Sequence, residues 1–276
     1  MKPELHRRMR ISAGWLALLL LAACAAPRPS VPPPAPVQPA PTPLPWTAAI
    51  GALQNLVNNQ TCTATLVEQN LILTAAHCLS DNRPDLAGRE FVFLPNEGAA
   101  PNFPPLPIRG IQAVGATVQQ GVIRSSQATG DWALLRIEPA PADLHPIAVN
   151  SLTWEQIQGR LAAGDHFFSG GYGAPGMQML TQHRNCKPID AAELGEFLND
   201  GLIATDCTVR LRDSGGPMVL VDTVGQPHLF AVISGIARPN SDHPFGVGVD
   251  SSRFLPFLKG LPLSEGDGIV VTTPAG

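Results

Sequence analysis

The chain has 276 residues, enough to bury a sizeable core in one large domain or two small ones. Hydrophobic residues make up 44% of it and charged residues 14%, a composition that excludes an intrinsically disordered protein. The net charge is −4 and the basic residues are not clustered after residue 10, which excludes a nucleic-acid-binding protein. The 26 glycines and 29 prolines favour a β-rich fold with many turns over long helices.

The N-terminal segment 1–23 has the features of an export signal. Four basic residues precede the apolar run 11–23, which is shorter than the roughly 20 residues that a membrane-spanning helix needs. The run ends in Leu-Ala-Ala before Cys24, which resembles the bacterial lipoprotein box, where cleavage leaves an acylated cysteine as the first residue. An ordinary signal peptide is the alternative interpretation, because Ala23 and Ala25 also satisfy the small-x-small cleavage rule.

The two interpretations give different locations. A lipid on Cys24 anchors the exported protein to the cell envelope, and the outer membrane is favoured over other periplasmic faces because Ala25 is not an aspartate. Cleavage as an ordinary signal peptide gives a secreted protein instead. In either case removal of residues 1–23 takes four basic residues and one acidic residue away, so the net charge falls from −4 to −7.

Residues 24–45 are interpreted as the anchor cysteine followed by a proline-rich linker. Ten prolines lie between residues 27 and 45, a composition that favours an extended polyproline II conformation and cannot build a core. At about 3.1 Å per residue, the linker could hold a following domain up to about 60 Å from Cys24. A semi-rigid spacer is therefore predicted, with a disordered tail of no function as the alternative.

From Trp46 onward short apolar runs are separated by Gly, Pro, Asn and Asp, the pattern of a β-sandwich or β-barrel. Helix signals are confined to residues 191–199 and 252–259. The predicted strands are 49–57, 61–68, 71–74, 91–94, 112–118, 133–137, 166–169, 217–221 and 229–234.

Three short motifs carry residues suited to nucleophilic catalysis. Thr-Ala-Ala-His-Cys includes His77, Gly-Asp-Trp-Ala-Leu-Leu includes Asp131, and Asp-Ser-Gly-Gly-Pro includes Ser214. Taken alone, each motif also fits a purely structural role: the first as a buried histidine beside a structural cysteine, the second as a turn and the third as a loop. A serine hydroxyl is a poor nucleophile without a neighbouring base, and an imidazole, with an unperturbed pKa of about 6.5, can accept its proton and later donate it.

Together, in the order His, Asp, Ser, the motifs resemble the trypsin/chymotrypsin family of serine proteases over about residues 46–260. The resemblance implies an all-β fold of two packed antiparallel β-barrels, with the active site in the cleft between them and a short C-terminal helix. The protease domain would span residues 46–276, with the first barrel at about 46–150 and the second at about 151–276.

The resemblance also implies the site residues. His77, Asp131 and Ser214 match the catalytic triad, in which Asp131 holds the required tautomer of His77 and stabilises its imidazolium. The backbone N–H groups of Arg212 and Ser214 match the oxyanion hole. Protein or peptide substrates are the partners implied, no cofactor is expected, and the activity implied is that of a serine endopeptidase forming an acyl-enzyme.

The cysteines support the same resemblance. Cys62 precedes Cys78 by 16 residues, the spacing at which the family ties a disulfide beside its catalytic histidine. Cys186 and Cys207 then remain to pair, and Cys24 is left for the lipid. A metal site is the alternative use of cysteines, but the chain has no paired Cys-x-x-Cys or His-x-x-x-His spacing, so none is predicted.

Substrate specificity is weakly encoded. Thr208, six residues before Ser214, matches the base of the primary specificity pocket, where trypsin-like members carry an aspartate. A neutral threonine argues against cleavage after Lys or Arg. The residues expected to form the walls of the pocket suggest that the substrate side chain is small or apolar instead. The walls are expected from residues 209–211, 234–236 and 245–247, which include Ser234, Gly235, Ile236 and Gly246.

Two features depart from the family pattern. Arg212 stands where the family has glycine, which leaves open whether its N–H can point into the oxyanion hole. The Ile-Val-Gly-Gly sequence, whose N-terminal ammonium group pairs with the aspartate matching Asp213 in activated members of the family, is missing. Asp213 is therefore expected to find another donor. Besides a cell-envelope endopeptidase, a binding or scaffold protein with a defective oxyanion hole and an esterase without peptidase activity are therefore alternatives.

Overall fold

A computed structural model describes residues 44–79, 90–96, 98–116, 125–173, 179–183, 186–190, 201–237 and 244–258. The export signal, the lipid on Cys24, most of the proline-rich linker and the helix predicted at 191–199 lie outside these residues. Within the described ranges, no helix is long and apolar enough to cross a membrane.

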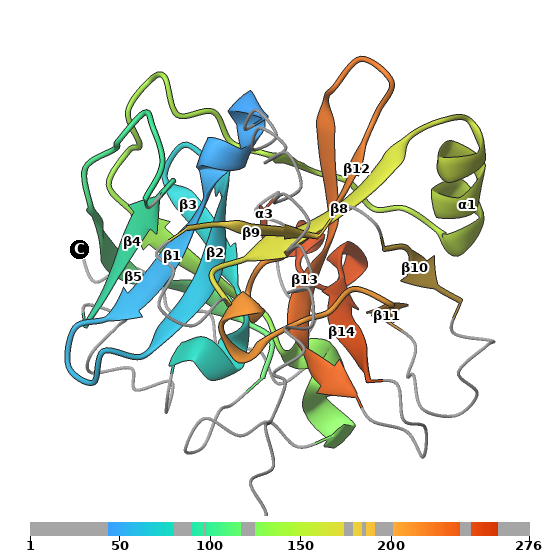
Figure 1. Ribbon diagram of the computed structural model, residues 1–276. Coiled ribbons are helices and arrows are strands. Elements are labelled where there is room, and N and C mark those ends of the chain that lie inside the picture. The colour runs from blue at the N-terminus through green and yellow to red at the C-terminus, as the bar shows by residue number, and fades with distance from the viewer. Residues whose placement is uncertain are drawn as a thin grey trace, which may run out of the picture. The chain divides into compact units, whose positions relative to one another are not determined.

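Six antiparallel strands from the first half of the chain close a barrel in the order β1-β2-β3-β6-β5-β4 (Figure 1). The four residues of β3 are all buried, and β3 contacts β13 of the second sheet. In contrast, β5 begins with alternating buried and exposed residues, the pattern of a strand with one face in solvent. The strands are β1 (Ile50–Asn55), β2 (Thr61–Glu68), β3 (Leu71–Thr74), β4 (Phe91–Pro95), β5 (Leu106–Val114) and β6 (Ala133–Ile137).

The second half of the chain forms an eight-stranded sheet, in which seven strands follow the order β10-β11-β14-β13-β12-β8-β9 and β7 pairs in parallel with β13. Its central strand β12 is buried at every residue, as expected of a continuous apolar run. The strands are β7 (Ala148–Val149), β8 (His166–Gly171), β9 (Thr181–His183), β10 (Pro188–Ile189), β11 (Leu202–Thr205), β12 (Pro217–Val221), β13 (Pro227–Ala237) and β14 (Phe245–Asp250).

Helical segments are short. The longest described is α1 (Trp154–Ala162), which begins with a capping box between Thr153 and Gln156. The short C-terminal helix predicted by the resemblance is present as α3 (Leu255–Leu258) after the turn η6. The 3₁₀ turns are η1 (Pro45–Ala49), η2 (Ala76–Leu79), η3 (Ser125–Gly130), η5 (Leu211–Asp213) and η6 (Ser251–Arg253).

One hydrophobic cluster joins the barrel to the sheet. Phe168 of β8 and Tyr172, the residue after this strand, belong to the same buried cluster as Leu66 and Leu73 of the barrel. Helix α3 also packs on the barrel, because the ring of Trp132, which directly precedes β6, lies 5.0 Å from that of Phe257. The segments between barrel and sheet are therefore held in fixed positions, and the candidate site lies among them.

The predicted all-β fold class is confirmed. Five of the nine predicted strands coincide with observed strands within one residue at each end, that at 166–169 is the first part of β8, and that at 49–57 contains β1. The strand predicted at 112–118 was misplaced, because β5 ends at Val114 and begins at Leu106. The strand predicted at 229–234 is the central part of the longer β13. Helix α1 and strands β7, β9, β10, β11 and β14 were not predicted.

Candidate active site

The pairing of two barrel strands brings His77 and Asp131 together. Thr74 at the end of β3 pairs with Ala133 at the start of antiparallel β6. His77 lies three residues after the first and Asp131 two residues before the second, so both leave the barrel at the same end. Ser214 reaches this place from the other half of the chain, between η5 and β12.

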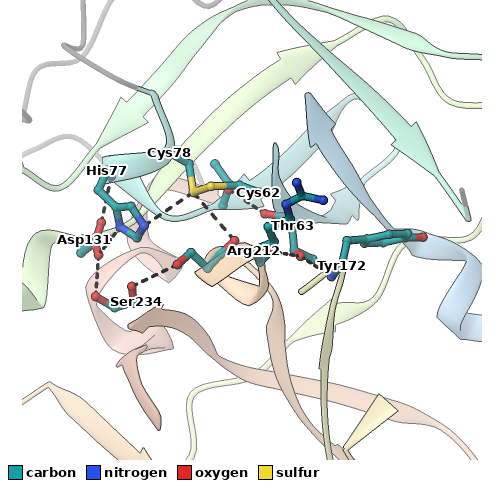
Figure 2. Close-up of a disulfide and its surroundings, with 10 residues drawn as sticks. Cys62, Thr63, His77, Cys78, Asp131, Tyr172, Arg212 and Ser234 are labelled. Atoms are coloured by element: carbon teal, nitrogen blue, oxygen red, sulfur yellow. Dashed lines mark hydrogen bonds and ion pairs between the residues drawn. A yellow bond between two sulfur atoms is a disulfide. The ribbon is translucent and has the colours of Figure 1, made fainter. Parts of the chain in front are cut away.

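The imidazole of His77 is held by the carboxylate of Asp131. His77 Nδ1 lies 2.8 Å from Asp131 Oδ2, and the His77 N–H donates to Oδ1 at 3.0 Å. Ser234 Oγ also donates to Oδ2 (Figure 2). Asp131 is only 3% exposed, and an ionised carboxylate only accepts hydrogen bonds, so Nδ1 carries the proton and a neutral ring leaves Nε2 free to accept one.

The side chain of Ser214 is turned toward β13. Its Oγ makes a long contact of 3.5 Å with the carbonyl oxygen of Ser234. Among the described residues no hydrogen bond joins Ser214 Oγ to His77 Nε2. Serine χ1 has three staggered positions, so rotation about one bond changes the partner of the hydroxyl, and catalytic hydrogen bonds often form only when substrate binds.

The backbone around Ser214 is fixed to both halves of the molecule. Thr63 of β2 donates from its N–H to the Ser214 carbonyl at 2.8 Å, and the Gly215 N–H donates to Ile233 of β13 at 2.7 Å. Gly215 has φ +84, and a Cβ there would lie 2.1 Å from the Thr63 carbonyl oxygen. Only glycine fits this close approach, which explains the residue after the serine.

Arg212 lies inside the 3₁₀ turn η5, and its side chain is exposed. Asn59 and Asn96 are the non-glycine residues with positive φ in the described chain, so φ at Arg212 is negative. A 3₁₀ turn directs each carbonyl toward the N–H three residues on, which sets the Leu211 carbonyl toward the Ser214 N–H. The Arg212 carbonyl is fixed by Thr63 Oγ1, which donates to it at 2.8 Å.

The donor predicted for Asp213 is supplied by three groups. Its carboxylate accepts from the N–H groups of Gly173 and Arg210, each at 2.8 Å. The Nε2 atom of His183 lies 3.4 Å from the second carboxylate oxygen. His183 belongs to β9 and was not singled out by the sequence, because no local motif marks it.

The residues expected at the specificity pocket lie where β13 and β14 pair. Ile236 faces Gly246 in the register of these strands. Thr208 is exposed, whereas Val209 is buried, and a methyl carbon of Val209 would lie 2.4 Å from a Cβ placed on Gly246. Val209, rather than Thr208, is thus the side chain packed against this strand. Of the other two predicted wall residues, Ser234 bonds Asp131 and Gly235 is half-buried.

Both predicted disulfides are present. Cys62 is bonded to Cys78 with a Cα–Cα distance of 6.1 Å, and Cys186 to Cys207 with 5.0 Å. The first lies beside the imidazole, with Cys78 Sγ 3.9 Å from His77 Nε2 (Figure 2). These atoms and Cys62 form a cluster with metal-ligand residue types, but both sulfurs are engaged in the disulfide, so no thiolate is available to bind a metal.

The sequence comparisons agree with this geometry. The family model described as Trypsin matches residues 37–258, which is most of the chain. A comparison with curated proteins finds no match. The closed barrel of antiparallel strands and the second sheet agree with this match. The chain belongs to the trypsin family of serine proteases.

Proposed function

We propose that this serine endopeptidase hydrolyses peptide bonds with His77, Asp131 and Ser214 as its catalytic triad. The observation that carries the proposal is the bonded pair of His77 and Asp131, with Nδ1 and Oδ2 2.8 Å apart, at the barrel end that Ser214 also reaches. The pair supplies a base whose free nitrogen can take the hydroxyl proton of a serine.

The reaction has two halves. In the first, Ser214 Oγ bonds to the carbonyl carbon of the substrate while His77 Nε2 takes the hydroxyl proton. The C–N bond then breaks, and His77 returns the proton to the leaving amine. In the second half, His77 takes a proton from water, the oxygen of which attacks the acyl-enzyme, and Ser214 leaves with that proton.

Asp131 serves the imidazolium that forms in both halves. Its two oxygens accept from the Nδ1–H and N–H of His77 and from Ser234 Oγ. These donors fix the carboxylate, so the ring keeps the tautomer in which Nε2 faces the nucleophile. Because Asp131 is buried, its negative charge acts on the ring with little screening by water.

The oxyanion hole is formed by the N–H groups of Arg212 and Ser214. Such donors stabilise the negative charge that develops on the carbonyl oxygen. In the resting turn the Leu211 carbonyl is directed toward the Ser214 N–H. The peptide between Leu211 and Arg212 must therefore rotate when substrate binds, so that its N–H takes the place of its carbonyl.

The substrate side chain before the scissile bond is small or apolar. Thr208 carries no charge to pair with a Lys or Arg side chain, and the buried Val209 occupies space against Gly246. The substrate backbone pairs with β13 at Ser234–Ile236 as an added strand. Profiling with a peptide library tests this, and a dominant preference for basic residues would overturn it.

The enzyme acts at the cell envelope, anchored by a lipid on Cys24. This proposal is supported by the apolar run that ends at Cys24 and by the proline-rich linker that follows it. Mass spectrometry of the membrane fraction tests it: the first residue must be an acylated Cys24. An unmodified N-terminus at Ala25 or later would support the secreted alternative.

Fluorophosphonate labelling tests the triad. Wild-type protein must be labelled and Ser214→Ala must not, while circular dichroism shows that both are folded. The 3₁₀ turn at Arg212 favours one competing function, a binding protein with a defective oxyanion hole, and such a protein stays unlabelled. An esterase without peptidase activity is labelled but does not cleave a peptide library.

A further inference from the structure

The carboxylate of Asp213 is fully buried immediately before Ser214. A buried carboxylate needs donors for its lone pairs and a partner that offsets its charge. The N–H groups of Gly173 and Arg210 supply two donors at 2.8 Å. Among the described residues, His183 is the side chain that faces Asp213, with Nε2 3.4 Å from Oδ2.

His183 is held in place by its strand. It is the last residue of β9 and pairs with Ser169 of β8, and its side chain is only 11% exposed. The disulfide of Cys186, three residues later, ties this part of the chain to Cys207, which precedes the serine loop. The imidazole therefore meets Asp213 from a fixed sheet and not from a chain end.

The space around Asp213 leaves its side chain few other positions. A Cβ on Gly171 would lie 2.6 Å from Asp213 atoms, and one on Gly173 would lie 2.4 Å from its Oδ1. The Asp213 backbone is fixed as well, because its N–H donates to the Arg210 carbonyl at 3.0 Å. Movement of this carboxylate would thus move the turn that sets the backbone of Ser214.

We propose that His183 is a positioning residue for this reaction: its Nε2–H donates to Asp213 and keeps Asp213 and the adjoining Ser214 in the orientation needed for attack. The inference rests on the proposed function, in which Ser214 is the nucleophile. Because a carboxylate only accepts, the proton must lie on Nε2 of His183. The donor belongs to β9, a strand of the second sheet, so the orientation of the serine is set from within the sheet.

Three variants of His183 separate donation by Nε2 from simple filling of space. His183→Gln places an amide nitrogen near the position of Nε2, whereas His183→Asn has the same amide one methylene shorter and does not reach Asp213. His183→Phe fills the volume of the imidazole but has no donor, and it serves as a second variant in which the hydrogen bond to Asp213 is lost. The full chain of each is compared with wild type and with Ser214→Ala in fluorophosphonate labelling, peptide hydrolysis and thermal unfolding.

The Asn and Phe variants are expected to be labelled roughly 10- to 100-fold more slowly, the range for losing a hydrogen bond to a charged group. His183→Gln is expected to stay within about threefold of wild type, because it keeps the donor. The loss must fall on kcat and leave KM within about twofold, because within the described ranges the side chain of His183 bonds Asp213 and not β13, with which the substrate pairs.

The outcomes separate the two proposals. Equal labelling of Asn, Gln and wild type would overturn the role of His183, and so would equal slowing of Asn and Gln with matching losses of thermal stability. Failure of both Asn and Phe variants to fold would assign His183 a structural role only. Wild type that is not labelled would overturn the proposed function, and the positioning role would fall with it.

Discussion

Replacing Arg212 by glycine tests whether the backbone of the serine loop limits the rate. In the resting structure Arg212 has a negative φ within the turn η5. For its N–H to enter the oxyanion hole, the preceding peptide must rotate by about half a turn, which carries φ to the positive side. A residue with a Cβ is disfavoured there, whereas glycine is not.

The magnitude follows from this difference. The left-handed region costs a residue with a Cβ about 1–2 kcal/mol, which corresponds to a factor of about 5–30 in an equilibrium. Arg212→Gly is therefore expected to raise kcat/KM by roughly 5- to 30-fold. The gain has a ceiling of about 100-fold or somewhat more, which is the value of one oxyanion donor.

Arg212→Ala is the matched control, because it removes the guanidinium but keeps the Cβ. Both variants and wild type are compared in kcat/KM on one peptide substrate and in the rate of fluorophosphonate labelling. Alanine should stay near wild type while glycine gains. An unchanged rate in the glycine variant, or an equal gain in both, would refute the argument from φ.

Three further predictions concern other parts of the domain. The pKa of Asp222 lies below its ordinary value of 3.8, chiefly because the Gln226 N–H donates to the carboxylate. Its charge thus stabilises the fold at pH values above 3.8, and this contribution is lost as pH falls through the lowered pKa. Asp222→Asn should therefore lose less thermal stability than wild type between neutral and acidic pH, and equal losses would contradict this. Thr63→Val leaves the buried Tyr172 N–H without its acceptor and should lower the free energy of unfolding by about 1–3 kcal/mol in urea titrations, with an unchanged midpoint as the contrary result. Val209→Ala opens space against β14 and should raise kcat/KM for leucine relative to alanine before the scissile bond by about tenfold, whereas an unchanged ratio would place the pocket elsewhere.

Local sequence was enough to predict the triad candidates. His77, Asp131 and Ser214 each stand in a short motif beside a strand, so their type, order and context are all visible in the sequence. The barrel strands beside His77 and Asp131 were also predicted, because 71–74 and 133–137 are short segments made mostly of apolar residues. What sequence could not supply was the pairing of those strands, which brings the side chains within hydrogen-bond distance.

Strand β14 was missed because of its glycines. Gly246 and Gly248 interrupt the alternation of the sequence, and glycine is depleted in strands. The structure shows why they are there: a Cβ on Gly246 would lie 2.4 Å from Val209, and one on Gly248 would lie 2.8 Å from the Val232 carbonyl oxygen. Packing between distant segments here overrides the local preference, and a pattern-based prediction has no access to it.

Helix α1 was missed for a different reason. Its start carries a signal that the sequence does contain, since Thr153 and Gln156 have the spacing of a capping box. The helix is amphipathic with few apolar residues, and Ile157 is its one buried residue. The helix was therefore not predicted from its weak apolar stripe, although its capping box is visible in the sequence.

The serine loop is held at two points, one on the barrel and one on the second sheet. One part of the loop can therefore move while the rest stays fixed. Asp213 is fixed by the second sheet, through Gly173 and His183. The Arg212 carbonyl is fixed by the barrel, through Thr63 Oγ1. Rotation of the peptide before Arg212 disturbs neither anchor directly, because both hold groups that follow it in the chain. The oxyanion hole can thus form while Ser214 stays in place, so we expect changes at Arg212 to affect the oxyanion hole and changes at His183 to affect the position of the serine.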